Sequence, residues 1–389
     1  MCGIIGAVGR GSDTLDVLVH GLSKLEYRGY DSAGVALASD SIDVCKKAGE
    51  LDELRGALEG RSVQGSVGIG HTRWSTHGPP TDANAHPHQD CSGDVAVVHN
   101  GIIENYQELR DELASAGHTF RSDTDTEVVP HLVEDELRGG ADPEAAVRAA
   151  LSRLEGSYAV AVVIAGVEQI FAARNDSPLV LGISDDAYYL ASDVPAFRDH
   201  TDRVVYMNDG EFAALDAGGW TVTTLDGEPV EKPVDTVDWD PEETGKSGYD
   251  HYMLKEIHEQ PRSLRQCLSE RVDELAGTVD IDDLADLNPR GVQFVACGTS
   301  YHAALYGAEL FQQAGIPAQA FLASEYASSP PPIGDALVIG VTQSGETADT
   351  LSALREADRR GARTLGVTNV VGSTVARECD HVFYIRAGP

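Results

Sequence analysis

Hydrophobic and polar positions follow two different patterns along the chain. Up to residue 240, short apolar segments of strand length are interspersed with amphipathic stretches of helical period, which predicts a mixed α/β domain. The segments that predict strands are 4–8, 33–38, 67–70, 95–99, 158–164, 169–173, 179–182, 188–191 and 203–206. Those that predict helices are 13–25, 50–59, 103–116, 126–138 and 143–154.

Beyond residue 250, strands and helices alternate regularly. Residues 241–250 are polar and contain Gly and Pro, so they predict a linker between a domain at 1–240 and a domain at 251–389. After a helix over about 250–270, near-continuous apolar strands alternate with helices, which is typical of a doubly wound parallel sheet. The expected strands are 292–297, 318–322, 336–341, 364–367 and 381–385, and the expected helices are 301–314, 347–360 and 373–378.

Charge changes the picture of the surface. The chain has 63 acidic and 29 basic residues, a formal net charge of −34, and only six of the basic residues are lysine. A dispersed acidic surface that is poor in lysine keeps a protein dissolved in concentrated salt, where repulsion is screened over about 3 Å. We interpret it as an adaptation to high salt. It excludes nucleic acid as an expected partner, because that needs a basic surface.

Hydropathy and cysteine usage point to the cytoplasm. No apolar run reaches membrane-spanning length, and the N-terminus has no basic segment followed by a long apolar stretch, so no membrane partner is expected. The cysteines are scattered without a CxxC pair, which favours free thiols in a reducing compartment over a disulfide framework. They are Cys2, Cys45, Cys91, Cys267, Cys297 and Cys379.

Cys2 is the first candidate for chemistry. If Met1 is trimmed, Cys2 carries both a thiol and a free α-amine, and an α-amine with a pKa near 8 can accept the thiol proton at neutral pH. Nucleophile and general base would then belong to one residue. The alternative is an ordinary buried cysteine beside an uncleaved methionine.

Three further segments carry candidate binding groups. The first contains Arg73 and Trp74. The guanidinium could make a bidentate contact with a small carboxylate that the indole covers, or the Arg73 and Trp74 side chains could form a surface cation–π pair. The second is Asn100-Gly101, which usually marks a hairpin turn. Here a helical pattern follows, so the Asn100 amide and the Gly101 N–H could instead form an oxyanion hole.

The third segment is 122–127, which places carboxylates before the helix predicted over 126–138. Asp123-Thr124-Asp125 has good N-capping chemistry, because such side chains accept hydrogen bonds from the first backbone N–H groups of a helix. One of the carboxylates could instead bind a substrate ammonium. The capping interpretation is favoured for most of these residues.

The histidines allow a metal site as an alternative. Their spacing matches no familiar zinc pattern, and neither CxxC nor HExxH accompanies them. We therefore expect a hydrogen-bonded scaffold around the site, with no metal and no cofactor. The histidines are His71, His77, His86, His88 and His99.

Six sequence blocks together resemble the glutaminase domain of class II glutamine amidotransferases. The blocks are 2–4, 25–34, 71–78, 84–87, 99–105 and 122–127. The resemblance implies a four-layer αββα N-terminal-nucleophile (Ntn) hydrolase sandwich over 1–240, with Cys2 as nucleophile and its own amine as base. It implies Asn100 and Gly101 as the oxyanion hole and Arg28 as an organiser of the site. For glutamine it implies Arg73 on the α-carboxylate, Asp125 on the α-ammonium, Thr76 and His77 as pocket lining, and Trp74 as gate.

Two polar turns mark the second domain. Cys297-Gly298-Thr299-Ser300 follows its first strand, and residues 342–347 follow its third. Hydroxyl and N–H groups at two helix N-termini on the carboxyl edge of a parallel sheet make a phosphate site, whereas either turn alone would indicate helix capping. These turns resemble those of sugar isomerase (SIS) domains, and 251–389 is expected to be the first such domain. By that resemblance Thr299, Ser300, Thr342, Gln343, Ser344 and Thr347 bind a phosphosugar.

The combination resembles the glutamine–fructose-6-phosphate aminotransferase (isomerizing) family, the glucosamine-6-phosphate synthases. It implies glutamine and fructose 6-phosphate as substrates, glucosamine 6-phosphate and glutamate as products, and a homodimer. That family carries two SIS domains and this sequence contains one, so the lysine, glutamate and histidine expected from the second are not assigned. We expect either a piece of a longer enzyme or a naturally shortened one.

Other functions remain as alternatives. One is a stand-alone glutaminase that is regulated by a phosphosugar-sensing SIS domain. A phosphoribosyl-transferring amidotransferase is disfavoured, because the chain has no acidic pyrophosphate-binding loop, and an asparagine synthetase is disfavoured because it has no SGGxDS-type loop.

Overall fold

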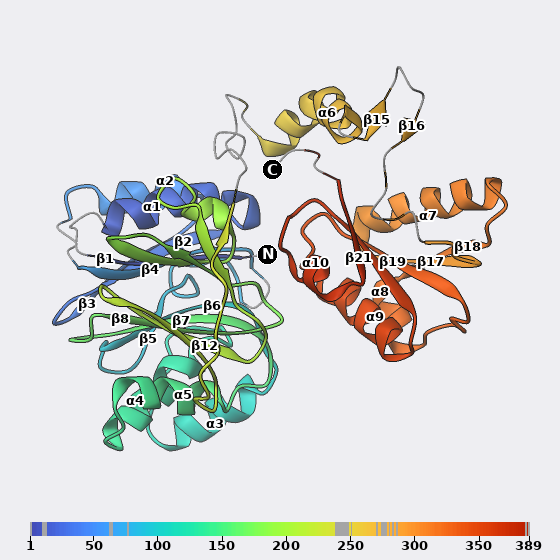
Figure 1. The fold of residues 1–389 in the computed structure, drawn as a ribbon. Coiled ribbons are helices and arrows are strands. Elements are labelled where there is room, and N and C mark those ends of the chain that lie inside the picture. The colour runs from blue at the N-terminus through green and yellow to red at the C-terminus, as the bar shows by residue number, and fades with distance from the viewer. Residues whose placement is uncertain are drawn as a thin grey trace. The chain divides into compact units, whose positions relative to one another are not determined.

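Contacts divide the chain into two units, Met1–Thr244 and Gly245–Pro389, in the computed structural model (Figure 1). Each unit is described by itself. The structure describes residues 2–9, 14–61, 65–75, 78–237, 249, 251–269, 271–273, 278, 279, 281, 284, 287–385 and 387. None of the helices described in these ranges is long and apolar enough to cross a membrane.

The first unit is built on two antiparallel sheets. The eight-stranded sheet has the order β14 (Asp235–Thr236), β11 (Arg203–Tyr206), β9 (Val180–Ile183), β10 (Ala187–Ala191), β1 (Gly3–Gly9), β4 (Val67–Arg73), β2 (Ser32–Ala38) and β3 (Ile42–Ala48). The six-stranded sheet has the order β13 (Gly219–Thr224), β12 (Glu211–Asp216), β8 (Gln169–Asn175), β7 (Gly156–Ile164), β6 (Val95–Ile103) and β5 (His88–Gln89).

Helices cover the outer face of each sheet, which completes four layers (Figure 1). The helices on the eight-stranded sheet are α1 (Thr14–Lys24) and α2 (Leu51–Leu58), and those on the six-stranded sheet are α3 (Tyr106–Ser115), α4 (Val128–Arg138) and α5 (Pro143–Leu151). Two short 3₁₀ turns lie at Glu26–Arg28 and Val194–Ala196. This arrangement confirms the αββα sandwich.

Successive side chains of the central strands enter different cores. In β1, Ile4 and Val8 lie between the two sheets, whereas Ile5 and Ala7 pack under the outer helices. The same alternation occurs in β6 and β7. Because side chains alternate between the faces of a strand, a sheet covered on both faces needs apolar residues at every position. The continuous apolar runs in the sequence therefore record burial on both faces.

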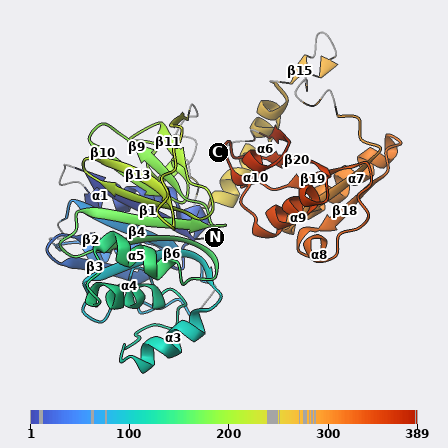
Figure 2. The same cartoon turned by 60° about the horizontal axis from the view of Figure 1, so that its bottom comes forward.

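The second unit contains a parallel five-stranded sheet, which confirms the doubly wound fold. Its order is β18 (Ala318–Leu322), β17 (Gly291–Ala296), β19 (Ala336–Val341), β20 (Arg363–Thr368) and β21 (His381–Tyr384). Figure 2 shows helices on both sides of this sheet. They are α7 (Gly298–Gln313), α8 (Ala323–Ser328), α9 (Ala348–Arg359) and α10 (Thr374–Glu378). Helix α6 (Tyr252–Ser269) and the small pair β15 (Val272–Asp273) and β16 (Thr278–Val279) precede it.

The structure corrects several predicted elements. Helix α4 begins at Val128, and its N-cap residue Glu127 makes no side-chain capping bond, so Asp123-Thr124-Asp125 does not cap it. Helix α3 begins only at Tyr106, because β6 continues to Ile103. The sequence pattern also missed α8, β12 and the edge strands β3 and β13. An edge strand such as β3 is only partly buried, so it lacks a continuous apolar run.

Gly101 lies within β6 at a position that requires glycine. Its φ is +123°, and an added Cβ would lie 2.0 Å from the carbonyl oxygen of Ser157 on β7. We expect Gly101→Ala to lower the free energy of unfolding by about 3 kcal/mol or more, since backbone strain and a backbone clash combine.

Gly227→Ala is the matched control for this substitution. Gly227 has a φ of +90° but open space around the added Cβ, so the strain alone should cost about 1–2 kcal/mol. Chemical denaturation of both variants gives the comparison. Equal losses would show that the approach of β7 to Gly101 does not constrain this residue.

Candidate functional site

Cys2 lies immediately before β1, at the end of a central strand of its sheet. The antiparallel register of β1 and β4 places Gly3 opposite Thr72, which brings the residues after β4 next to Cys2. The Trp74 N–H donates to the Cys2 Sγ at 3.2 Å, and the Sγ lies 3.5 Å from the Trp74 carbonyl oxygen. Burial raises the pKa of the thiol, while the backbone contact with Trp74 and the positive charges of Arg73 and Arg28 oppose that rise.

Arg28 holds the backbone of the nucleophile. Its Nε donates to the Cys2 carbonyl oxygen at 3.1 Å, and its NH1 donates to Asp193 Oδ2 at 3.1 Å. The Tyr27 hydroxyl donates to the same Asp193 oxygen at 2.6 Å, and desolvation of the hydroxyl together with that carboxylate raises the pKa of Tyr27. Arg28 is buried, so its paired carboxylate offsets the cost of removing the guanidinium from water.

Asn100 contacts the same carbonyl from the other sheet. Its Nδ2 donates to the Cys2 oxygen at 3.0 Å and to Ser192 Oγ at 2.8 Å. Its Oδ1 lies 3.0 Å from His71 Nε2, and burial lowers the pKa of His71 to about 3. His71 is therefore neutral, and its Nε2–H donates to Asn100, which fixes the orientation of the amide.

Ser192 and Asp193 are site residues that the sequence reasoning missed. Both follow β10, whose register with β1 places Ala191 opposite Ile5, so the next residues lie beside the start of β1. The Ile4 N–H donates to Ser192 Oγ at 2.9 Å. The available signal was a polar Ser-Asp pair directly after the apolar segment 188–191.

Asn100 and Gly101 are not in a turn. Both belong to β6, which pairs with β7 as far as Ile103, and the predicted helix begins three residues later. Gly101 is exposed, so its backbone can be approached from solvent.

Arg73 and Trp74 end β4 and begin the segment that follows. Arg73 is buried, and burial lowers the pKa of its guanidinium, whereas Cys2, Asp125 and Asp31 act on it in the opposite direction. Its NH1 and NH2 lie 3.4 and 3.3 Å from the carbonyl oxygens of Pro79 and Gly78.

Trp74 is 45% exposed and packs edge-on against Tyr30, with ring centroids 5.5 Å apart. The Ser75 N–H donates to Asp31 Oδ2 at 2.7 Å, which anchors this segment. Thr76 and His77, two further expected site residues, lie outside the described residues.

Asp125 is buried and supports the end of β6. Its Oδ2 accepts a hydrogen bond from the Ile103 N–H at 2.8 Å, and Thr126 Oγ1 lies 3.4 Å from its Oδ1. The neighbouring Glu127 accepts from the backbone of Arg121 and Ser122, each at 2.6 Å. Asp125 and Glu127 therefore bind backbone N–H groups outside the helix.

The histidines near the site form a buried, stacked group. The rings of His71 and His86 stack with centroids 4.1 Å apart, and His88 meets His86 edge-on at 4.6 Å. The His99 N–H donates to His86 Nδ1 at 3.2 Å, and Thr126 Oγ1 lies 2.9 Å from His99 Nδ1. Burial holds the pKa of His86 and His88 well below the usual histidine value, so these rings are neutral scaffold.

The two hydroxyl-rich turns of the second unit lie at one edge of its sheet. Strands β17 and β19 are parallel neighbours with Ala296 opposite Val341, so the turns that follow them are adjacent. Thr299 and Ser300 occupy the first turn of α7, and Thr347 is the N-cap residue of α9. The first turn also contacts the start of α9, because Cys297 Sγ lies 3.7 Å from Asp349 Oδ2.

Internal hydrogen bonds shape the second of these turns. Thr342 Oγ1 lies 2.9 Å from Thr347 Oγ1 and accepts from the Gly345 N–H at 3.2 Å. The Glu346 N–H donates to Ser344 Oγ at 3.1 Å. Gln343 is exposed and Ser344 is half-buried, so both can be reached by a ligand.

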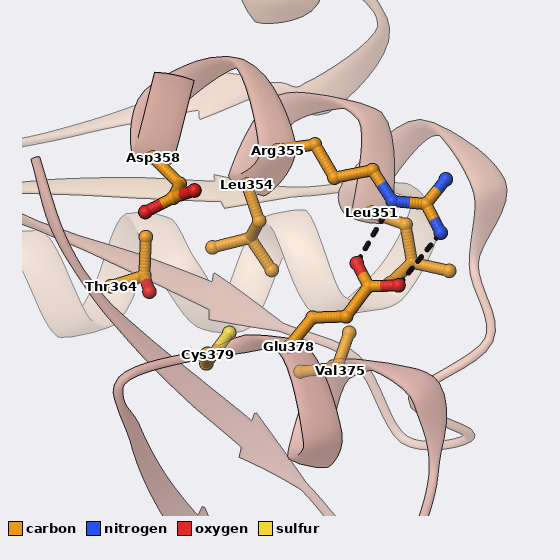
Figure 3. Close-up of a pocket in the computed structure, with 8 residues that line it drawn as sticks. All are labelled: Leu351, Leu354, Arg355, Asp358, Thr364, Val375, Glu378 and Cys379. Atoms are coloured by element: carbon orange, nitrogen blue, oxygen red, sulfur yellow. Dashed lines mark hydrogen bonds and ion pairs between the residues drawn. The ribbon is translucent and has the colours of Figure 1, made fainter. Parts of the chain in front are cut away.

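A pocket elsewhere in this unit contains none of the expected sugar-binding residues. Figure 3 shows it between α9, β20 and α10, with Leu354 and Cys379 at its apolar side. Arg355 and Glu378 form a two-pronged ion pair across it, with both N–O distances 2.8 Å.

Comparison with known proteins agrees with the division of the chain into two units. The model of the glutamine amidotransferase domain matches residues 71–199, and that of the SIS domain matches residues 287–389. Glutamine–fructose-6-phosphate aminotransferases (isomerizing) from Halobacterium salinarum and Methanothermobacter thermautotrophicus are 54% and 50% identical over 100% of the chain. The chain spans about two thirds of each relative, 65% of its length.

Two solved structures share the fold. Glutamine phosphoribosylpyrophosphate amidotransferase from B. subtilis has a TM-score of 0.52 at 18% identity and covers 99% of this chain and 90% of its own. A structure described as the allosteric regulatory enzyme of purine biosynthesis has a TM-score of 0.53 at 21% identity and covers 99% and 80%. At such identities the likeness concerns the fold alone.

The full-length similarity and the two domain matches together show that the chain belongs to the glutamine–fructose-6-phosphate aminotransferase (isomerizing) family, of which it carries a glutamine amidotransferase domain and a SIS domain.

Proposed function

We propose that this chain hydrolyses glutamine at Cys2 and that the ammonia is delivered to fructose 6-phosphate, giving glucosamine 6-phosphate and glutamate. The observation that carries the proposal is that the Cys2 carbonyl accepts two hydrogen bonds, one from Arg28 in the 3₁₀ turn before β2 at 3.1 Å and one from Asn100 on β6 at 3.0 Å. These bonds fix the backbone of the nucleophile beside an amide donor and an accessible glycine.

The chemistry at Cys2 follows from this arrangement. Removal of Met1 would free the α-amine, which accepts the thiol proton, and the thiolate then attacks the side-chain carbonyl carbon of glutamine. Asn100 Nδ2 and the Gly101 N–H stabilise the oxyanion. Asn100 Nδ2 gives up its hydrogen bond to the Cys2 carbonyl oxygen and donates to the oxyanion instead. Ammonia leaves with a proton from the α-amine, and water hydrolyses the remaining thioester to glutamate.

Charged side chains would hold the rest of the glutamine molecule. We assign Arg73 to the α-carboxylate and Asp125 to the α-ammonium, with Trp74 as an exposed cover. Cys2 and Asp125 oppose the effect of burial on the pKa of the Arg73 guanidinium, which supports a charged Arg73 that can hold a carboxylate. Thr76 and His77 would line the same pocket.

The second unit would bind the sugar phosphate at the edge formed by its two turns. Hydroxyl groups and backbone N–H groups at the starts of α7 and α9 can surround a phosphate without lysine. We propose this role for Thr299, Ser300, Thr342, Gln343, Ser344 and Thr347. We also propose domain limits of 1–240 and 251–389. A homodimer, a cytoplasmic location and the lack of a nucleic-acid partner stay predictions.

Replacing the nucleophile tests the first half-reaction. We expect Cys2→Ala to reduce glutamate release by about 10³-fold or more, because no other group can form the thioester. Binding of fructose 6-phosphate should not change. Cys267→Ala, which removes a half-buried thiol from α6, is the control and should keep full activity. Substantial glutamate release by Cys2→Ala would exclude Cys2 as the nucleophile.

Two serine substitutions, one in the proposed sugar site and one outside it, test the sugar site. We expect Ser344→Ala to weaken fructose 6-phosphate binding about 10–100-fold, the effect of losing one hydrogen bond to a charged group. Ser328→Ala is the matched control, because its hydroxyl contacts only the Ser324 carbonyl of its own helix among the bonds described. Calorimetric titration measures both. Equal affinities for the two variants would place the phosphate elsewhere.

Following both products tests the coupled reaction. Glutamate and glucosamine 6-phosphate are measured together in molar salt, from glutamine with and without fructose 6-phosphate. Equal amounts of the two products are the result we expect for the aminotransferase. Glutamate release that fructose 6-phosphate stimulates, without any amino sugar, would instead favour the alternative of a glutaminase regulated by a phosphosugar.

A further inference from the structure

Four side chains that take no part in the glutamine site converge in the six-stranded-sheet half of the first unit. They are Cys91, His118, His131 and Glu134, and each offers one ligand atom within 4.8 Å of the others. Cys91 lies between β5 and β6, His118 lies between α3 and α4, and the other two lie on α4 three residues apart. Three separate segments of chain therefore meet at this cluster.

The distances within the cluster are short and nearly uniform. Cys91 Sγ lies 3.6 Å from His118 Nδ1 and 3.7 Å from His131 Nδ1. The two Nδ1 atoms are 3.2 Å apart. Glu134 Oε2 lies 3.1 Å from His118 Nδ1 and 3.4 Å from His131 Nδ1.

These five distances can be compared with the edges of the tetrahedron that four ligand atoms form around a zinc ion; the sixth, between Cys91 Sγ and Glu134 Oε2, is below 4.8 Å. With bonds of about 2.3 Å to sulfur and about 2.0–2.1 Å to nitrogen and oxygen, tetrahedral angles separate sulfur from nitrogen by about 3.6 Å. They separate two nitrogens, or a nitrogen and an oxygen, by about 3.4 Å. Each of the five distances agrees with these values within about 0.3 Å, inside the scatter expected when small bond errors combine.

Hydrogen bonds between these side chains do not by themselves explain why all four atoms converge on one point. His118 Nε2 lies 2.9 Å from Asp135 Oδ1, so this nitrogen carries the proton and Nδ1 presents its lone pair to the cluster. His131 Nδ1 faces the same point, together with a thiol and a carboxylate oxygen. A proton joins two of these atoms at a time, whereas one divalent cation contacts all four.

We propose that Cys91, His118, His131 and Glu134 bind one Zn²⁺ ion. A thiolate and a carboxylate bring two negative charges to the ion, and Arg138 pairs with the other oxygen of Glu134, in a site where both histidines and Glu134 are buried. Asp135 orients His118 as an outer partner, the Thr119 N–H lies 3.5 Å from the Cys91 sulfur, and the Cys91 N–H donates to Glu134 Oε2 at 3.2 Å. Four protein ligands close the site, so the ion is structural.

The ion would hold the segment that carries Asp125. That segment runs from His118 to the start of α4, and the metal fixes it at both ends, at His118 and at His131. Because Asp125 bonds to the end of β6, the zinc would position part of the proposed glutamine site without touching the substrate. The metal content can be measured without any activity, so this inference stands or falls apart from the proposed function.

The experiment is metal analysis of the full chain, purified without chelator and dialysed. We expect about one zinc per chain, and none in Cys91→Ser or His131→Ala. Cobalt(II) added to the metal-free chain should give the thiolate charge-transfer absorption of a tetrahedral cobalt–sulfur centre, which Cys91→Ser abolishes. Cys267→Ser, which removes a thiol from α6, is the matched control and should retain both the zinc and the cobalt spectrum.

Asp135→Asn keeps all four ligands and guards against a ligand variant that fails to fold. We expect it to weaken zinc binding about 10–100-fold, the usual effect of losing a carboxylate behind a metal-bound histidine. A competition titration with a chromophoric chelator measures this change. A wild-type chain that contains no zinc and takes up neither zinc nor cobalt would overturn the proposal, as would full zinc and cobalt binding by Cys91→Ser.

Discussion

The constraint on which the rest of the first unit depends is the burial of both sheets on both faces. The layer between the sheets consists mainly of alanine, valine, leucine and isoleucine. Nearby strands of different sheets, such as β1, β4 and β6, therefore contact each other across this layer. That packing brings Asn100 to the carbonyl of Cys2, although the two residues are 98 positions apart in the sequence.

Around Cys2, buried positive charges are compensated by nearby acidic groups. Arg28 and Arg73 are buried in a strongly acidic chain that contains few basic residues. Asp193 compensates the first, and Asp31, Asp125 and Cys2 act on the second. Buried cations near a thiol favour its thiolate form and oppose the effect of desolvation. The same fold keeps the neighbouring histidines neutral, so they serve as hydrogen-bonding scaffold and add no further positive charge.

The candidate glutamine site and the four-residue cluster are assembled from different parts of the first unit. The candidate glutamine site combines buried polar groups, such as Arg73 and Asp125, with the half-buried Cys2 and the exposed Trp74 and Gly101, through which a substrate can enter. The cluster of Cys91, His118, His131 and Glu134 lies between two loops and α4, where both histidines and Glu134 are buried and Cys91 is half-buried. The second unit follows a third route, in which parallel neighbouring strands place two polar turns side by side.

The sequence by itself determined the family and most of the element types. Continuous apolar runs reported strands buried on both faces, and the blocks around Cys2, Arg73 and Asn100 identified the glutamine amidotransferase domain. Its local patterns ended the strand at His99, before Asn100-Gly101, and gave Asp123-Thr124-Asp125 capping chemistry that α4 does not use, because hydrogen bonds to distant strands outweigh local propensity. Only the tertiary structure brought in Ser192 and Asp193 beside β1 and assembled the four-residue cluster. Both depend on strand register and layer packing, and these place residues together that no sequence spacing relates.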